Sequence, residues 1–292
     1  MKPGRILVGT DFSPASELAV QRAAALAAKF GAELRLIHAA PPRRWLPGIP
    51  GSRSAWTQQV RAQASAMLKA QAGRLSAEQG IEISTGLMED RASLAIASAV
   101  AQFEPELVVA GARGESMLKG PQPGLGQTAS RLLVTLQAPL LLVRRADIET
   151  PRRVLAALDL TAASRRVAQW AVAMAGKGGC TALHVFEAPF ADRLRSYGVS
   201  RKAIDVYAGN QQQEGEQALQ ALLNAAGVER RAARLVVRGE AIRVIAAHLK
   251  KLKADTLVLG KHTRRKRDAA QPHGSVCNHF AQFASTDVLV VP

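Results

Sequence analysis

The chain contains one sequence pattern twice. RILVGTDFSPASELAVQRAAALA at 5–27 aligns without a gap with RVLAALDLTAASRRVAQWAVAMA at 153–175, an offset of 148 residues, and nine positions are identical. Later segments agree as well: ELVVAG at 106–111 resembles DTLVLG at 255–260, and APLLLV at 138–143 resembles TDVLVV at 286–291. A repeat in register at both ends predicts two copies of one domain, at 1–147 and 152–292. Each copy is long enough to bury a core of its own.

Each copy alternates apolar runs, which predict strands, with Ala- and Leu-rich segments, which predict helices. In the first copy we expect strands at 6–9, 33–39, 81–86, 107–111 and 140–143, and helices at about 15–30, 55–79, 92–102 and 127–136. In the second copy we expect strands at 153–158, 181–187, 233–238, 256–260 and 287–291. Ser13, Pro14 and Gly31 are typical residues for the two ends of the first helix.

This alternation predicts an α/β fold: two tandem doubly wound domains, each a five-stranded parallel sheet flanked by helices. Ligands of such sheets bind beyond the carboxyl ends of the strands. Asp11 and the segment 111–114 both follow strand ends, so we expect them at one crevice. Asp159 and Gly260 are their counterparts in the second copy.

These features resemble the universal stress protein family over nearly the whole chain, twice. The opening strand ends in Asp (ILVGTD, VLAALD), and the fourth strand ends in Gly and is followed by a glycine loop, a short helix and a closing apolar strand. The resemblance implies the strand order 3-2-1-4-5 and a pseudo-dimer of the two copies through their closing strands. It also implies binding of ATP, with Mg²⁺, in a loop of the form Gly, two residues, Gly, nine residues, Gly, then Ser or Thr.

Each copy departs from this loop pattern in its own way. In the first copy Leu125 follows the third glycine, Gly124, or Gln127 follows it if Gly126 takes that place. In the second copy Thr263 replaces the second glycine, and Gly274 and Ser275 fit the end of the pattern. The nucleotide-binding residues that the resemblance implies are Asp11, Gly111, Arg113, Gly114, Gly124, Gly126, Gln127 and Thr128 in the first copy, and Asp159, Gly239, Gly260, His262, Gly274, Ser275 and Val276 in the second.

Two other interpretations of these residues are available. The segment 124–129, GLGQTA, has the spacing of a dinucleotide fingerprint, but it opens the last helix of a domain rather than the first helix after a strand. Asp11 and Asp159 are also typical turn or cap residues at strand ends. The sequence leaves the choice between a binding role and a turn role open for both aspartates.

The net charge of +16 is unevenly divided. Residues 1–150 carry 17 Lys and Arg against 12 Asp and Glu, and residues 151–292 carry 22 against 11. Such an excess favours polyanionic partners: a nucleotide, a nucleic acid or an anionic surface. The densest basic run, 262–267, could hold a polyphosphate or be a solvated loop, and the Pro- and Gly-rich segment 40–54 could be a lid over the crevice or a plain connector.

The sequence offers no catalytic constellation, so we expect no enzyme, with slow ATP hydrolysis left open. The adenylating enzymes of this fold carry Ser-Gly-Gly-x-Asp-Ser after the first strand, where this chain has Gly-Thr-Asp-Phe-Ser-Pro at 9–14. His262, His273, Cys277 and His279 fit no standard zinc spacing, so no metal is expected. Cys277 is interpreted as a small buried residue, with a lowered pKa as the alternative.

The combined expectation is a cytoplasmic stress-response module that binds ATP or a related nucleotide in one or both crevices. The absence of a signal peptide, of a long apolar run and of a disulfide framework underlies the expected location. The alternatives are a scaffold for a protein partner without bound nucleotide, and a nucleic-acid or anionic-surface binder that uses the basic second half. A homodimer through the closing strands is a further possibility.

Overall fold

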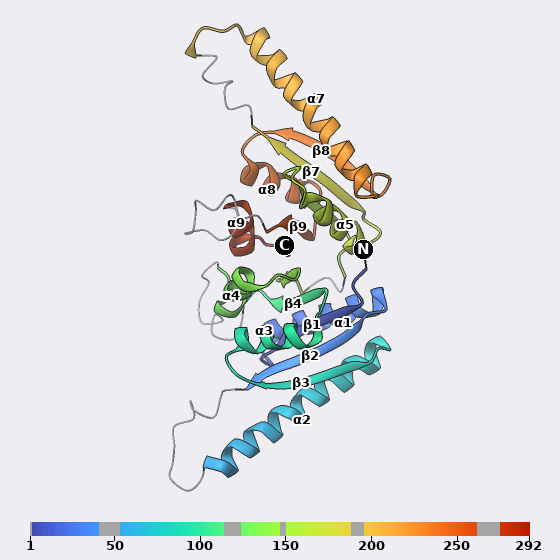
Figure 1. The fold of residues 1–292 in the computed structure, drawn as a ribbon, viewed down its shortest axis with the longest axis vertical. Helices are drawn as coiled ribbons and strands as arrows, with labels where there is room; N and C mark the ends of the chain where they lie inside the picture. Colours follow the sequence, from blue (N-terminus) through green and yellow to red (C-terminus); the bar gives the residue numbers. More distant parts are fainter. Residues whose placement is uncertain (1, 41–52, 114–123, 147–149, 188–195, 262–274) are drawn as a thin grey trace. The chain divides into compact units, whose positions relative to one another are not determined.

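A computed structural model describes residues 2–40, 53–113, 124–146, 150–187, 196–261 and 275–292 (Figure 1). Contacts divide the chain into two compact units. One unit spans residues 2–150 together with 281–287, and the other spans 151–280 together with 288–292. The short segment 281–287 therefore packs with the first repeat, although it comes from the end of the second.

The first repeat forms five parallel strands in the order β3-β2-β1-β4-β5. Helix α1 packs with α2, and α3 packs with α4, one pair on each face of the sheet (Figure 1). The elements are β1 (Arg5–Thr10), α1 (Pro14–Phe30), β2 (Glu33–Ala40), α2 (Arg53–Gln79), β3 (Ile83–Glu89), α3 (Ala92–Phe103), β4 (Leu107–Gly111), α4 (Gln127–Thr135) and β5 (Leu140–Val143).

The second repeat has the same topology, with strand order β10-β9-β6-β7-β8. The parallel pairs β6–β7, β6–β9 and β7–β8 correspond to the pairs around β1 and β2 in the first repeat. The elements are β6 (Val154–Ala157), α5 (Ser164–Met174), β7 (Cys180–Phe186), α7 (Arg201–Ala225), β8 (Ala232–Arg238), α8 (Ala241–Lys251), β9 (Thr256–Gly260), α9 (Ser275–Phe283) and β10 (Asp287–Val291). The predicted fold class and strand order are thus confirmed.

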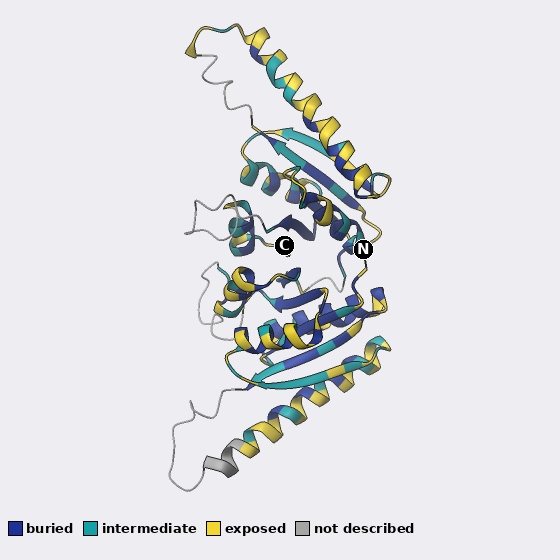
Figure 2. Ribbon diagram, viewed as in Figure 1, coloured by how far each residue is buried: buried dark blue, intermediate teal, exposed yellow. Residues whose placement is uncertain are grey.

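The core of each repeat is its central strands, which helices cover on both faces (Figure 2). Ile6, Leu7 and Val8 of β1 are completely buried, and every residue of β5, β9 and β10 is buried. Continuous apolar strands are typical of parallel sheets buried on both faces. The long helices α2 and α7 pack on the two outer strands of their repeats and on α1 and α5, and they expose much of their surface (Figure 2).

Local sequence signals define the two ends of helix α1, which follows the turn after β1. Ser13 is the N-cap of α1 and its side chain accepts a hydrogen bond from the Ser16 amide at 3.2 Å, with Pro14 in the first turn. Gly31 ends the helix in the left-handed conformation, at φ +64°. Both ends agree with the sequence prediction.

The third strand differs from its predicted bounds. It was expected at 81–86, whereas β3 continues through Gly86 to Glu89 because its pairing with β2 runs to Ala40. Gly86 is a close-packing position, since a Cβ there would lie 3.3 Å from Cγ2 of Ile37. The glycine was therefore not a strand terminator. The domain boundaries and the pairing of the two copies as a pseudo-dimer stay predictions.

Candidate functional site

The turn after β1 is a hydrogen-bonded cluster around Asp11. Its Oδ1 accepts from the Ser13 amide at 3.1 Å and from Ser13 Oγ at 2.5 Å. The Asp11 amide donates to Ser16 Oγ at 3.3 Å, and that hydroxyl donates to the Ser13 carbonyl at 2.9 Å. Phe12 has a left-handed backbone at φ +61°. This arrangement fixes the aspartate at the carboxyl end of the strand.

The second repeat builds the same turn. Asp159 Oδ1 accepts from Thr161 N at 3.1 Å, Thr161 Oγ1 at 2.8 Å and Ser164 Oγ at 2.7 Å, and Leu160 has φ +63°. A turn role is therefore present at both aspartates. The copies differ in the bond of the helix serine: Ser164 donates its hydroxyl directly to the Asp159 carboxylate, whereas Ser16 donates its hydroxyl to the backbone.

A histidine supports each turn from the neighbouring strand. His38 Nδ1 lies 2.8 Å from the Thr10 carbonyl, and His184 Nδ1 lies 2.9 Å from the Leu158 carbonyl. The His38 ring packs on Phe12 with ring centroids 4.5 Å apart. Both histidines therefore contact the backbone at the base of the turn.

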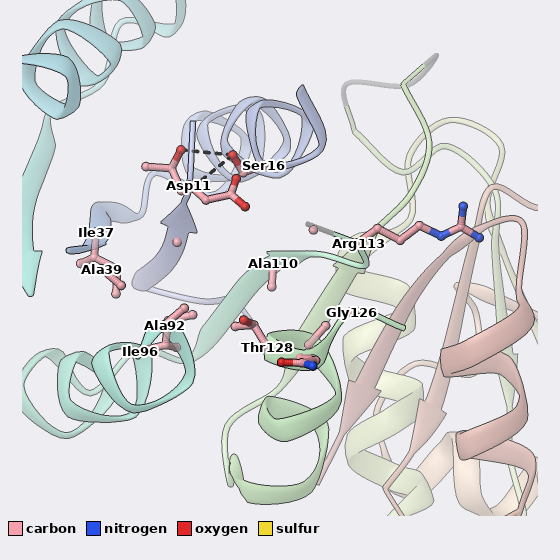
Figure 3. A pocket seen from close by; sticks show the side chains of 15 residues that line it. Asp11, Ser16, Ile37, Ala39, Ala92, Ile96, Ala110, Arg113, Gly126 and Thr128 are labelled. Carbon is pink, nitrogen blue, oxygen red and sulfur yellow. Dashed lines mark hydrogen bonds between the residues drawn. The ribbon is translucent and has the colours of Figure 1, made fainter. Parts of the chain in front are cut away.

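A cavity of about 350 Å³ opens between this turn, α3, β4 and the start of α4 (Figure 3). One wall is polar, with Thr10, Asp11 and the buried hydroxyl of Ser16. The opposite wall is apolar and comes from β2, α3 and β4: Ile37, Ala39, Ala92, Ile96 and Ala110. Gly9, Gly111, Arg113, Gly126, Gln127, Thr128 and Ala129 complete the lining.

Six of the first copy's predicted binding residues therefore line one cavity: Asp11, Gly111, Arg113, Gly126, Gln127 and Thr128. Gly124 lies beside it, because its carbonyl accepts from Arg113 Nε at 3.4 Å. The Arg113 side chain extends away from the other lining residues (Figure 3). Burial and the charge of Arg113 together lower the pKa of Arg144 to about 10. Gly114 is outside the described residues.

The two described glycines at the ends of the loop have different roles. A Cβ on Gly111 would lie 3.1 Å from the carbonyl oxygens of Ala15 and Arg113, so this glycine is required for packing. Gly126 is the N-cap of α4, and its amide donates to the Ala112 carbonyl at 2.8 Å. No side chain caps α4, and Gln127 and Thr128 of its first turn line the cavity.

A second helix start, that of α3, also reaches the cavity and differs from its counterpart in the second repeat. Ala92, the first residue of α3, lines the cavity, and the N-cap Arg91 makes no side-chain capping bond. The counterpart α8 has Glu240 as N-cap, and this carboxylate accepts from Ile242 N at 2.9 Å and Arg243 N at 3.1 Å. The amides at the start of α8 are therefore already paired with a carboxylate of the chain.

The predicted residues of the second crevice are described in part. Gly260 is buried at the end of β9, and Ser275 and Val276 begin α9. Gly239 follows β8 at φ +152°, where a Cβ would lie 2.7 Å from Val244 Cγ2, so it is a packing glycine. His262 and Gly274 lie outside the described residues, as do the basic run at 262–267, His273 and most of the expected lid at 40–54.

Burial determines the pKa of both cysteine thiols. It raises the pKa of Cys180 and of Cys277 to about 12, and nearby Arg231 and Lys261 only partly oppose this. The interpretation of Cys277 as a small buried residue is confirmed, and the alternative of a lowered pKa is wrong. Within the described ranges, no group of three or more His, Cys, Asp or Glu side chains is placed to hold a metal ion, and no helix is long and apolar enough to cross a membrane.

The universal stress protein family model matches the chain twice, over residues 3–144 and 150–292. The chain belongs to the universal stress protein family. It is a tandem member, since the two matches together cover nearly all of its 292 residues. No curated protein sequence matches the chain.

Solved structures agree with this assignment. A universal stress protein from Archaeoglobus fulgidus DSM 4304 is 16% identical at a TM-score of 0.71, and the alignment covers 100% of this chain and 99% of that one. A functionally unknown protein from Pseudomonas aeruginosa PAO1 is 17% identical at a TM-score of 0.63, covering 99% and 92%. A universal stress protein in complex with cAMP is 22% identical at a TM-score of 0.37, covering 49% and 98%. At these identities the first two likenesses show the shared fold.

Several cavity residues were not predicted from the sequence. Ser16 could have been found from the sequence, because the aligned position in the second copy, Ser164, is also a serine. No feature of the sequence indicated that Ala92 and Ile96 line the cavity, because their helix is distant in the chain from the turn after β1. Gly9 allows Ile96 to approach: a Cβ there would lie 3.2 Å from Ile96 Cδ1. The apolar wall is therefore a product of tertiary packing.

Proposed function

We propose that this tandem universal stress protein is a non-catalytic regulatory module that binds ATP or a related nucleotide in its first crevice. The observation that carries the proposal is the cavity of about 350 Å³, which combines three surfaces in one space. They are an apolar wall, a carboxylate with a buried hydroxyl, and a helix start without a side-chain cap. Ligand sites are typically apolar clefts of this size with a few convergent polar groups.

Each surface suits one part of a nucleotide. The wall formed by Ile37, Ala39 and Ile96 can cover a base, and Asp11 can accept hydrogen bonds from ribose hydroxyls. The amides at the start of α4 can donate to phosphate oxygens, which the helix dipole also favours. Mg²⁺ would be held largely by the phosphates of the nucleotide itself.

The difference between the copies supports the first crevice over the second. At the start of α3 the Asp90 carboxylate accepts, among the described residues, only from the Arg91 amide, at 2.7 Å, and Arg91 makes no side-chain capping bond, whereas the Glu240 carboxylate caps the start of α8. A carboxylate at that position repels a phosphate and occupies two of the amides that would bind it. The cytoplasmic location and the role in the stress response expected from the sequence remain part of the proposal.

The decisive experiment is to denature the purified protein and separate the released small molecules by anion exchange against ATP, ADP, AMP and cAMP standards. Protein freed of ligand is then titrated with ATP and Mg²⁺ by calorimetry. Bound nucleotide, or calorimetric binding, supports the proposal. An empty extract with no heat of binding contradicts it and favours a scaffold for a protein partner.

A further inference from the structure

A buried ion pair joins helix α1 to the last part of the chain. Arg22 Nη1 donates to Asp287 Oδ2, and the two side chains are 2% and 0% exposed. Arg22 Nη2 donates to the Arg145 carbonyl at 3.0 Å. Asp287 Oδ1 accepts from the amides of Arg144 at 2.8 Å and Arg145 at 3.0 Å. The carboxylate is therefore satisfied on both oxygens.

These partners all belong to the unit formed by residues 2–150 and 281–287. Within that unit the segment 281–287 makes a second contact, because Arg144 Nη2 donates to the Ala281 carbonyl. The end of the second repeat thus contributes both a charge and a backbone acceptor to the first. A unit built from the first repeat alone would lack both groups.

Alignment of the two repeats shows why Arg22 requires Asp287 and not the counterpart of Asp287 in the first repeat. At the offset of 148 residues, Trp170 corresponds to Arg22 and Pro139 corresponds to Asp287. Neither copy contains both members of the ion pair. A closing strand that presented Pro139 to Arg22 would bury a guanidinium without a carboxylate and leave two backbone amides without their acceptor. Uncompensated buried charge is strongly unfavourable.

We infer that Arg22 and Asp287 form a matching device that selects the chain's own segment 281–287 as the partner of the surface around Arg22. The same device disfavours the equivalent segment of another chain's first repeat, which carries Pro139. It therefore opposes the homodimer of first copies through their closing strands that the sequence left possible. The closing strands beyond this position are similar, LLLV at 140–143 and VLVV at 288–291, so the discrimination rests on Asp287 against Pro139.

A double-mutant cycle on the full-length protein tests the pairing. Arg22→Met and Asp287→Asn are each expected to lower the melting temperature by roughly 6–20 °C. The asparagine keeps an acceptor for the amides of Arg144 and Arg145, so the cycle isolates the charge. The double variant is expected to recover much of the loss, since no buried charge is left unpaired. Additive losses would overturn the inference.

A matched control comes from a more exposed pair. Arg74 donates to Glu17, with side chains 44% and 29% exposed, so Arg74→Met is expected to lower the melting temperature by at most about 4 °C. If neither single variant at Arg22 or Asp287 folds, the double variant still decides the question. A folded double variant supports the matching device, and an unfolded one contradicts it.

Amide hydrogen exchange identifies the partner. In the Asp287→Ala protein, the peptide that contains Arg144 and Arg145 should exchange faster, because their amides lose their acceptor. In the unmodified protein, protection of this peptide should be the same after hundredfold dilution, since a contact within one chain does not depend on concentration. Protection that disappears on dilution would mean that a second chain supplies Asp287, which overturns the inference.

Discussion

At the residue scale, the two aspartates share a turn and differ in their surroundings. Asp11 lines the cavity and is held by Ser13, whose amide and hydroxyl both donate to Oδ1. Asp159 receives three donors on the same oxygen, including the hydroxyl of Ser164. Turn formation therefore explains the presence of aspartate in both copies. A binding role for Asp11 has to be separated from its turn role.

The variant Asp11→Asn separates the binding role of Asp11 from its turn role, because asparagine keeps Oδ1 as an acceptor for Ser13 while removing the charge. We expect nucleotide affinity to fall by roughly 10-fold or more, as for hydrogen bonds to charged groups, with little change in melting temperature. Calorimetry and thermal unfolding measure the two effects. Asp159→Asn is the matched control and should leave the affinity unchanged, and equal losses for both variants would contradict binding in the first crevice alone.

The thiols give a prediction that depends on pH. Because burial holds the pKa of Cys180 and Cys277 at about 12, both stay protonated in the folded protein at pH 9, where an unfolded chain is half ionised. Thiolate absorbance at 240 nm should stay flat between pH 7 and 9, below the range where the two tyrosines ionise, and should rise over the same range in denaturant. The folded state then holds more protons than the unfolded state, so the thiols' contribution to stability falls as pH rises above about 9. Early native ionisation would contradict this.

At the element scale, the start of α4 is the feature that a phosphate would use. Gln127→Glu adds a negative charge there, which the helix dipole favours and a phosphate opposes. We expect unchanged or slightly higher stability together with a loss of ATP affinity of at least about 10-fold. Calorimetry checks the affinity.

The matched control for Gln127→Glu is Ser275→Glu, at the same helix position in the second repeat. The same charge at the same place in α9 should leave ATP binding unchanged. An effect of Ser275→Glu as large as that of Gln127→Glu would show that both crevices bind.

Helix α8 has a cap that α3 lacks. Glu240→Ala removes the acceptor of two amides and should cost about 1 kcal/mol in the free energy of unfolding, measured by urea titration. Glu240→Gln keeps an acceptor and should cost clearly less. Equal costs for the two variants would mean that the charge, and not the capping hydrogen bonds, stabilises the helix.

At the scale of the whole molecule, two similar repeats lead us to expect unequal sites. One nucleotide per chain is the expected calorimetric stoichiometry, because the N-cap of α3 makes no side-chain capping bond beside a defined cavity, whereas α8 is capped by Glu240. In the Glu240→Ala protein a second, weaker site should become measurable. Two equal sites in the unmodified protein would show that the cap does not control binding.

The sequence determined the fold of this protein almost completely. The repeat, the buried strands and local signals such as Ser13, Pro14 and Gly31 predicted the elements, because helix ends and buried strands depend mostly on neighbouring residues. β3 was the exception, since pairing with β2 carried the strand past Gly86. Asp11, Gly126 and Gln127 could be predicted as candidates because they follow strand ends or begin a helix.

The tertiary structure alone decided the roles of other residues. Gly111 looked like a phosphate-contacting glycine, but its missing Cβ makes room for the Ala15 carbonyl, a contact between elements distant in the chain. Ile96 reached the cavity for the same reason, through packing on Gly9. Arg22 and Asp287 lie 265 residues apart, and only folding brings them together. Periodicity and turn chemistry are local properties that a sequence displays, whereas these contacts depend on which surfaces the folded chain places in van der Waals reach.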